Sequence, residues 1–176
     1  MTSRLLAFCG SLRAGSTNAA VLRTAALVAP EGVTVTVFEG LAELPHFNPD
    51  DDVEPLDPAV VVLRSAVAAA DALLISTPEY AGALPGSFKN LLDWTVGGME
   101  ISRKPVGWIN ASATGGARSA HDSLGKVLGY VDALVVDAAC ADIPVARRDV
   151  GADGLIADPT IRSHIADVIQ VLAEQP

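Results

Sequence analysis

The architecture of this chain follows from one segment near its N-terminus, Leu5-Leu6-Ala7-Phe8-Cys9-Gly10-Ser11-Leu12-Arg13-Ala14-Gly15-Ser16-Thr17-Asn18. It begins as an apolar run and then breaks into glycine and small polar residues. A helix-like pattern of apolar residues follows over 19–28. This succession predicts a buried strand, a loop and the start of a helix.

The polar half of this segment has the chemistry of an anion site. The first N–H groups of a helix lack intrahelical partners and lie at the positive end of its dipole, so a loop there can hold a phosphate. Ser11, Ser16, Thr17 and Asn18 add short hydrogen-bonding side chains, and Arg13 adds a fixed charge. Taken alone, the segment fits an ordinary helix N-cap equally well.

The rest of the chain alternates between short β-rich runs and longer runs rich in alanine and leucine. The predicted strands are Arg4 to Cys9, Val33 to Phe38, Ala72 to Ser76, Val106 to Asn110 and Ala133 to Val136. The predicted helices are Asn18 to Val28, Pro58 to Ala69, Leu84 to Val96, Ser119 to Tyr130 and Thr160 to Ala173. Unbroken apolar strands, each followed by a helix, indicate a parallel sheet covered on both faces.

The pattern therefore predicts an α/β protein of the flavodoxin-like, doubly wound kind. Its parallel sheet would be five-stranded, in the order 2-1-3-4-5, with helices on both faces. Ligands of such folds bind beyond the carboxyl ends of the first, third and fourth strands, so three loops should meet there. With 176 residues, half of them hydrophobic, the chain suits a single domain over residues 1–176.

The composition argues against two classes of partner, membranes and nucleic acids. Apolar runs of roughly five to eight residues fall short of the ~20 that span a bilayer, and no signal peptide is recognisable, so we expect a cytoplasmic protein without a membrane partner. A net charge of -9, with 12 Lys and Arg spread along the chain, argues against a nucleic-acid partner. Cys9 and Cys140 form no CxxC pair and are expected to be small apolar residues in a reducing compartment.

The loop after the third strand has the most specific pattern, Thr77-Pro78-Glu79-Tyr80-Ala81-Gly82-Ala83-Leu84-Pro85-Gly86-Ser87-Phe88-Lys89-Asn90-Leu91-Leu92-Asp93-Trp94. Pro78 ends the strand, Gly82 permits a close backbone approach, and Pro85 suits the first turn of a helix. Such a loop offers backbone N–H and C=O groups to a flat ligand.

Together with the first loop, this pattern resembles the NADPH-dependent FMN reductase family, whose members carry G-S-x-R-x-x-S-x-N and P-E-Y-N-x-x-x-P-G-x-x-K-N-x-x-D-W. The resemblance extends from about Leu5 to Val136. It implies that the FMN phosphate is held by Ser11, Arg13, Ser16, Thr17 and Asn18. It further implies that the flavin ring and ribityl chain lie along Pro78, Glu79, Tyr80, Ala81 and Gly82. Ala81 replaces the family's usual Asn, so that side-chain contact is not carried over, whereas backbone contacts are.

A third loop, 110–118, follows the fourth strand. Its Ser112, Gly115 and Gly116 are expected to contact the flavin edge, because paired glycines let a ring lie close to the backbone. The alternative is a plain glycine-rich turn. Arg147, Arg148 and Asp149, beyond the fifth strand, are interpreted as a solvated connection, or as help in recruiting an acidic partner or NADPH.

The resemblance implies an FMN-dependent oxidoreductase that takes NADPH or NADH and reduces a small-molecule acceptor such as a quinone, an azo compound, an oxidised metal ion or free flavin. No dedicated catalytic residue is expected, because the flavin carries the chemistry. No metal site is expected either, since the histidines and cysteines lack ligand spacing. The alternatives are a flavodoxin-type electron carrier, whose Ser/Thr-x-Thr-Gly-x-Thr loop differs from the one here, and a flavin-binding module without turnover.

Two expectations concern surfaces. The helix from Leu84 has an apolar stripe with Trp94 off its centre, which favours a homodimer or homotetramer built around that helix. The alternative is that Trp94 packs under a loop of its own chain. The segment from Leu41 to Leu56, rich in proline and acidic residues, is predicted as a solvated loop, or else a lid or subunit contact.

Overall fold

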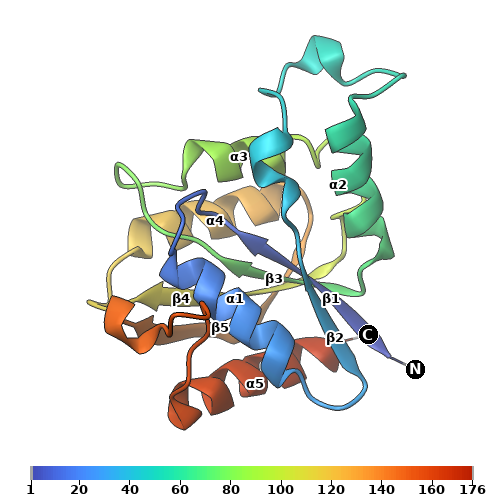
Figure 1. The fold of residues 1–176 in the computed structure, drawn as a ribbon. Coiled ribbons are helices and arrows are strands. Elements are labelled where there is room, and N and C mark those ends of the chain that lie inside the picture. Colours follow the sequence, from blue (N-terminus) through green and yellow to red (C-terminus); the bar gives the residue numbers. More distant parts are fainter. Residues whose placement is uncertain (1, 176) are drawn as a thin grey trace.

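The computed structural model describes residues 2–175, and within them a parallel sheet carries helices on both faces (Figure 1). Its strands are β1 (Ser3–Cys9), β2 (Val33–Val37), β3 (Ala72–Ser76), β4 (Pro105–Ser112) and β5 (Leu134–Val145). They lie in the order β2-β1-β3-β4-β5, and every pairing is parallel. The predicted flavodoxin-like order 2-1-3-4-5 is confirmed.

The helices follow the strands in alternation. They are α1 (Thr17–Val28), α2 (Pro58–Ala69), α3 (Gly86–Asp93), α4 (Arg118–Tyr130) and α5 (Pro159–Ala173), with short 3-10 turns η1 (Gly40–Glu43), η2 (Pro49–Asp51) and η3 (Arg147–Asp149). Figure 1 shows α1 and α5 on one face of the sheet and α2, α3 and α4 on the other. None of the helices within residues 2–175 combines the length and apolar character that crossing a bilayer requires.

Each face of the sheet has its own core, because successive strand side chains point to opposite sides. In β3, Leu73 and Ile75 pack with the residues of α2, α3 and α4, whereas Leu74 packs with those of α1 and α5. All three side chains are fully buried. The central strands are therefore covered on both faces, as their unbroken apolar sequences predicted.

The fifth strand is longer than predicted, since it continues from Leu134 to Val145. Its second half alternates polar and apolar residues instead of forming an apolar run, and Asp137 and Asp142 are exposed. This is the pattern of an edge strand, which a search for unbroken apolar runs misses. Helix α3 is shorter than predicted: it begins at Gly86, after Pro85, and ends at Asp93.

Trp94 is buried within its own chain, at 1% exposure. Its Nε1 donates a hydrogen bond to the carbonyl of Pro45 (2.8 Å), and its ring meets that of Phe47 edge to face at 5.0 Å between centroids. Leu41 and Leu44 of the same segment are buried as well. The expectation that Trp94 needs a partner surface is therefore wrong. The segment between β2 and α2 is not simply solvated, because it covers this side chain.

Candidate ligand-binding site

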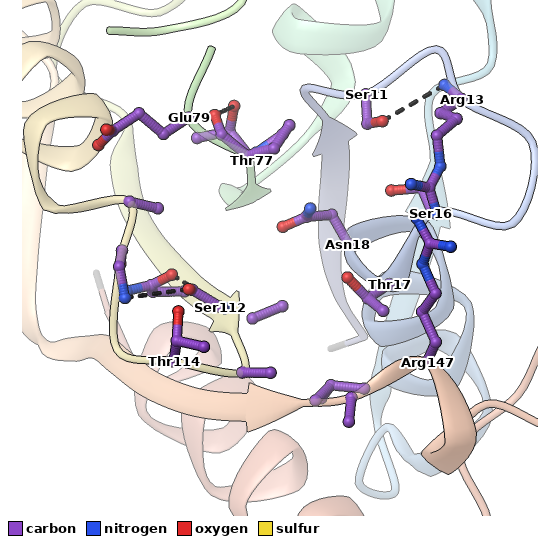
Figure 2. Close-up of a pocket in the computed structure, with 18 of the residues that line it drawn as sticks. Ser11, Arg13, Ser16, Thr17, Asn18, Thr77, Glu79, Ser112, Thr114 and Arg147 are labelled. Carbon is purple, nitrogen blue, oxygen red and sulfur yellow. Dashed lines mark hydrogen bonds between the residues drawn. The ribbon is translucent and has the colours of Figure 1, made fainter. Parts of the chain in front are cut away.

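The loops that follow β1, β3 and β4 meet at the carboxyl edge of the sheet and enclose a pocket of about 520 Å³ (Figure 2). Small-molecule sites typically measure roughly 300–1,000 Å³. The predicted site residues that line it are Ser11, Arg13, Ser16, Thr17, Asn18, Pro78, Glu79, Tyr80, Ser112 and Gly116. Ala81, Gly82 and Gly115 belong to the same loops but are not among the lining residues.

Further lining residues were not among the cofactor contacts predicted from the sequence. They are Thr77, Asn110, Ala111, Ala113, Thr114, Ala117, Val145, Ala146 and Arg147. Most flank a predicted residue and could have been added by extending each loop. Val145, Ala146 and Arg147 reach the pocket because β5 is longer than predicted.

The first loop presents the N-terminus of α1 to the pocket. Ser16 is its N-cap: its Oγ accepts from the N–H of Ala19 (3.4 Å), and its carbonyl accepts from that of Ala20 (3.0 Å). The N–H groups of Thr17 and Asn18 find no acceptor within residues 2–175. A helix N-cap and an anion site are therefore compatible here, because the cap satisfies one N–H and leaves two for a ligand.

The first loop packs closely against β3 and the start of the second loop. A Cβ at Gly10 would lie 2.1 Å from Oγ1 of Thr77, so only glycine lets the first two loops approach so closely. The buried Ser76 Oγ lies 2.9 Å from Oδ1 of Asn18 and 2.8 Å from the carbonyl of Ile109. Burial raises the pKa of the neighbouring Cys9 thiol, which keeps it neutral near pH 7.

The second loop turns sharply at its tip. The N–H and carbonyl of Tyr80 bond to the carbonyl and N–H of Ala83 (3.0 and 3.1 Å). Between them Ala81 has φ 51° and Gly82 has φ 74°. Two successive positive φ values define a type I′ turn, whose preferred sequence is Asn-Gly. Ala81 and Gly82, at the tip of the turn, are not among the lining residues, whereas the half-exposed Tyr80 is.

Glu79 joins the second loop to the third. Its Oε2 accepts from the N–H of Ala120 (3.1 Å) in the first turn of α4. The N-cap of that helix, Ala117, has φ 63° and offers no capping side chain. Glu79 therefore supplies the cap from another loop, which fixes the two loops relative to each other.

The third loop is both a glycine-rich turn and a wall of the pocket. Asn110 Nδ2 donates to the carbonyl of Gly116 (2.9 Å) and to Oδ1 of Asp142 (2.8 Å). Ser112 Oγ accepts from the N–H of Gly116 (3.0 Å). Gly115 adopts φ 69° at the turn itself. These bonds set the shape of the turn and leave Ser112 and Gly116 facing the pocket.

A sheet of this order, with its pocket formed by loops at the carboxyl ends of neighbouring parallel strands, defines a flavodoxin-like α/β protein with its ligand site at the topological switch point. The family model for NADPH-dependent FMN reductase matches residues 3–146, and the chain belongs to this family. The match covers all three pocket loops and the whole of β5.

Named relatives agree with this assignment. An NAD(P)H-dependent FMN reductase of Pseudomonas aeruginosa is 33% identical over 172 residues, covering 96% of this chain and 92% of the relative. A quinone reductase of Escherichia coli is 34% identical over 140 residues, covering 76% and 73%. A flavoenzyme NAD(P)H:(acceptor) oxidoreductase from Paracoccus denitrificans has the same fold, with a TM-score of 0.77, 24% identity and coverage of 97% of both chains.

Proposed function

We propose that this protein binds FMN in the pocket and uses NAD(P)H to reduce a small-molecule acceptor, with quinones as the first class to test. The observation that carries the proposal is the convergence of both family motifs on one pocket at the switch point of the sheet. Relatives named as FMN reductases and quinone reductases support the choice of cofactor and acceptor.

The residues present fit FMN. One end of the pocket has the free N–H groups of Thr17 and Asn18 at a helix N-terminus, together with the guanidinium of Arg13. This is the donor set that a terminal phosphate needs. FMN has one such phosphate, whereas FAD would require room for an adenosine half beyond it.

When bound, FMN would supply the redox chemistry by accepting a hydride from NAD(P)H and passing its electrons to the acceptor. The chain's own residues bind FMN and orient it. The carboxylate of Glu79 accepts the N–H of Ala120, which orients the second loop against the start of α4. The hydroxyl groups of Ser112 and Thr114 line the pocket on the third loop and are placed to hydrogen-bond a polar ring edge.

The test is steady-state oxidation of NADPH with benzoquinone as the acceptor and no other protein. The chain is stripped of flavin, assayed, reloaded with FMN and assayed again. We expect turnover that needs both FMN and quinone, and repetition with NADH gives the nucleotide preference. An electron carrier would hold FMN and yet fail to consume NADPH without a partner protein. That result would overturn the enzyme assignment.

We also propose that the protein is a homo-oligomer, dimer or tetramer. Trp94 no longer supports this, but Val61 and Val62 of α2, and Val96 and Met99 beyond α3, expose large apolar side chains. Exposed apolar side chains favour association where they gather into one patch. Light scattering at micromolar concentration should give a mass of at least twice 18.1 kDa. A monomer that turns over normally would refute this part alone.

A further inference from the structure

Two guanidinium groups meet at one end of the pocket. Figure 2 shows Arg13, from the loop after β1, and Arg147, from the turn after β5, pointing toward one another beside Ser16. Within residues 2–175 neither forms an ion pair with a carboxylate. Like charges that face each other without an intervening carboxylate are unfavourable unless an anion lies between them.

Hydrogen bonds hold the turn that carries Arg147 in place. Asp149 Oδ2 accepts from the N–H of Ala146 (2.7 Å), which closes η3 around Arg147. The next residue, Val150, bridges to Ile156. The N–H of Ile156 in turn donates to Oγ1 of Thr24 in α1 (3.0 Å). The turn that carries Arg147 is therefore linked, through Val150 and Ile156, to the same helix whose N-terminus faces the pocket.

Its neighbour Arg148 lies in the same turn, but its side chain is not part of the pocket lining. The Arg148 side chain is 89% exposed and forms an ion pair with Asp149 (3.8 Å). The two arginines are adjacent in sequence and identical in charge. Only one of them is aimed at the pocket, which makes the other a matched control.

We propose that Arg147 is a specificity-determining residue, which with Arg13 clamps the terminal phosphate of FMN and so selects FMN over riboflavin. This rests on the proposed FMN site. A phosphate monoester carries about −1.5 to −2 charges near pH 7, which two guanidinium groups can match. Each planar guanidinium can also donate two parallel hydrogen bonds to phosphate oxygens. Riboflavin lacks the phosphate and would leave the two cations facing each other.

The experiment measures dissociation constants of FMN and riboflavin for flavin-free protein by fluorescence quenching. The variants are Arg147→Ala, Arg147→Lys, Arg148→Ala and Arg13→Ala. We expect Arg147→Ala to weaken FMN binding by about 10- to 100-fold, as the loss of charge-assisted hydrogen bonds implies, and to change riboflavin binding less than about twofold. Arg13→Ala should behave alike, Arg147→Lys should keep part of the FMN affinity, and Arg148→Ala should match the wild type.

Three results would overturn the proposal. FMN affinity that is unchanged in Arg147→Ala but reduced in Arg13→Ala would leave the FMN site intact and remove Arg147 from it. Equal losses in Arg147→Ala and Arg148→Ala would indicate only a long-range charge effect. A raised KM for NADPH, with KM for NADH and the FMN dissociation constant unchanged, would assign Arg147 to the nucleotide. If the wild type binds neither flavin, the proposed function itself fails, which distinguishes that case from these.

Discussion

Ala81 occupies a backbone conformation that an asparagine would adopt at lower cost. Its φ of 51° lies in the left-handed region, where a Cβ crowds the following carbonyl unless the side chain is short and polar. The family's usual Asn at this position therefore has a conformational reason, apart from any contact with a flavin. The sequence showed the replacement, but only the backbone shows what it changes.

Ala81→Asn should stabilise the protein. We expect the free energy of unfolding to rise by about 0.5–1 kcal/mol, because Asn tolerates the left-handed conformation that Ala81 is forced into. Chemical denaturation measures this. Ala83→Asn is the control, since Ala83 is an exposed alanine of the same turn outside its two left-handed positions, and it should bring no gain. An equal gain in both variants would mean that the turn conformation is not the cause.

Glu79 should matter for stability as well as for the pocket. Glu79→Ala removes the side-chain acceptor of the Ala120 N–H, so we expect a loss of about 1 kcal/mol in unfolding free energy, the usual value of a helix cap. Glu79→Gln keeps an acceptor oxygen and should lose less. Glu31→Ala, in an exposed turn, is the control. Unchanged stability in Glu79→Ala, with weaker FMN binding, would show that the carboxylate serves the ligand and not α4.

At the scale of the elements, the sequence predicts strands that are unbroken apolar runs and helices that begin and end at clear breaks in the apolar pattern. The strands β1 and β3 and the helices α1, α2 and α5 match their predicted bounds to within a residue. The full length of β5 could not be predicted, because Asp137, Asp142 and Pro144 interrupt its apolar residues and make the sequence resemble a loop. From the sequence, Arg147 was therefore interpreted as a solvated connection, or as help in recruiting an acidic partner or NADPH. Its place in the pocket lining depends on where β5 ends.

The link between α1 and the turn after β5 depends on Thr24. Its buried hydroxyl donates to the carbonyl of Ala20 (2.8 Å) and accepts from the N–H of Ile156 (3.0 Å). Thr24→Val would leave that N–H without a partner, at a cost of about 1–3 kcal/mol in unfolding free energy. Thr36→Val, on the exposed side of β2, should cost little. Chemical denaturation measures the unfolding free energy of both variants. Similar costs in both would contradict a role for the buried hydrogen bond.

At the scale of the whole molecule, the sheet order was predictable because each central strand is apolar and each crossover is helical. The place of the pocket followed from that order. The two motifs and the third loop together contain the ten lining residues that were predicted. Trp94 was misjudged for a reason that periodicity cannot detect. A segment distant in sequence, around Pro45 and Phe47, folds over it.

The central claim is that this chain, alone, binds FMN and lets NAD(P)H reduce it. The most direct measurement is an anaerobic titration of the FMN-loaded protein with NADPH, followed through the visible absorbance of the flavin. We expect the absorbance to bleach at about one NADPH per bound FMN and to return when benzoquinone is added, since the flavin carries two electrons from one to the other. Protein that holds FMN but is bleached by neither NADPH nor NADH would contradict the account.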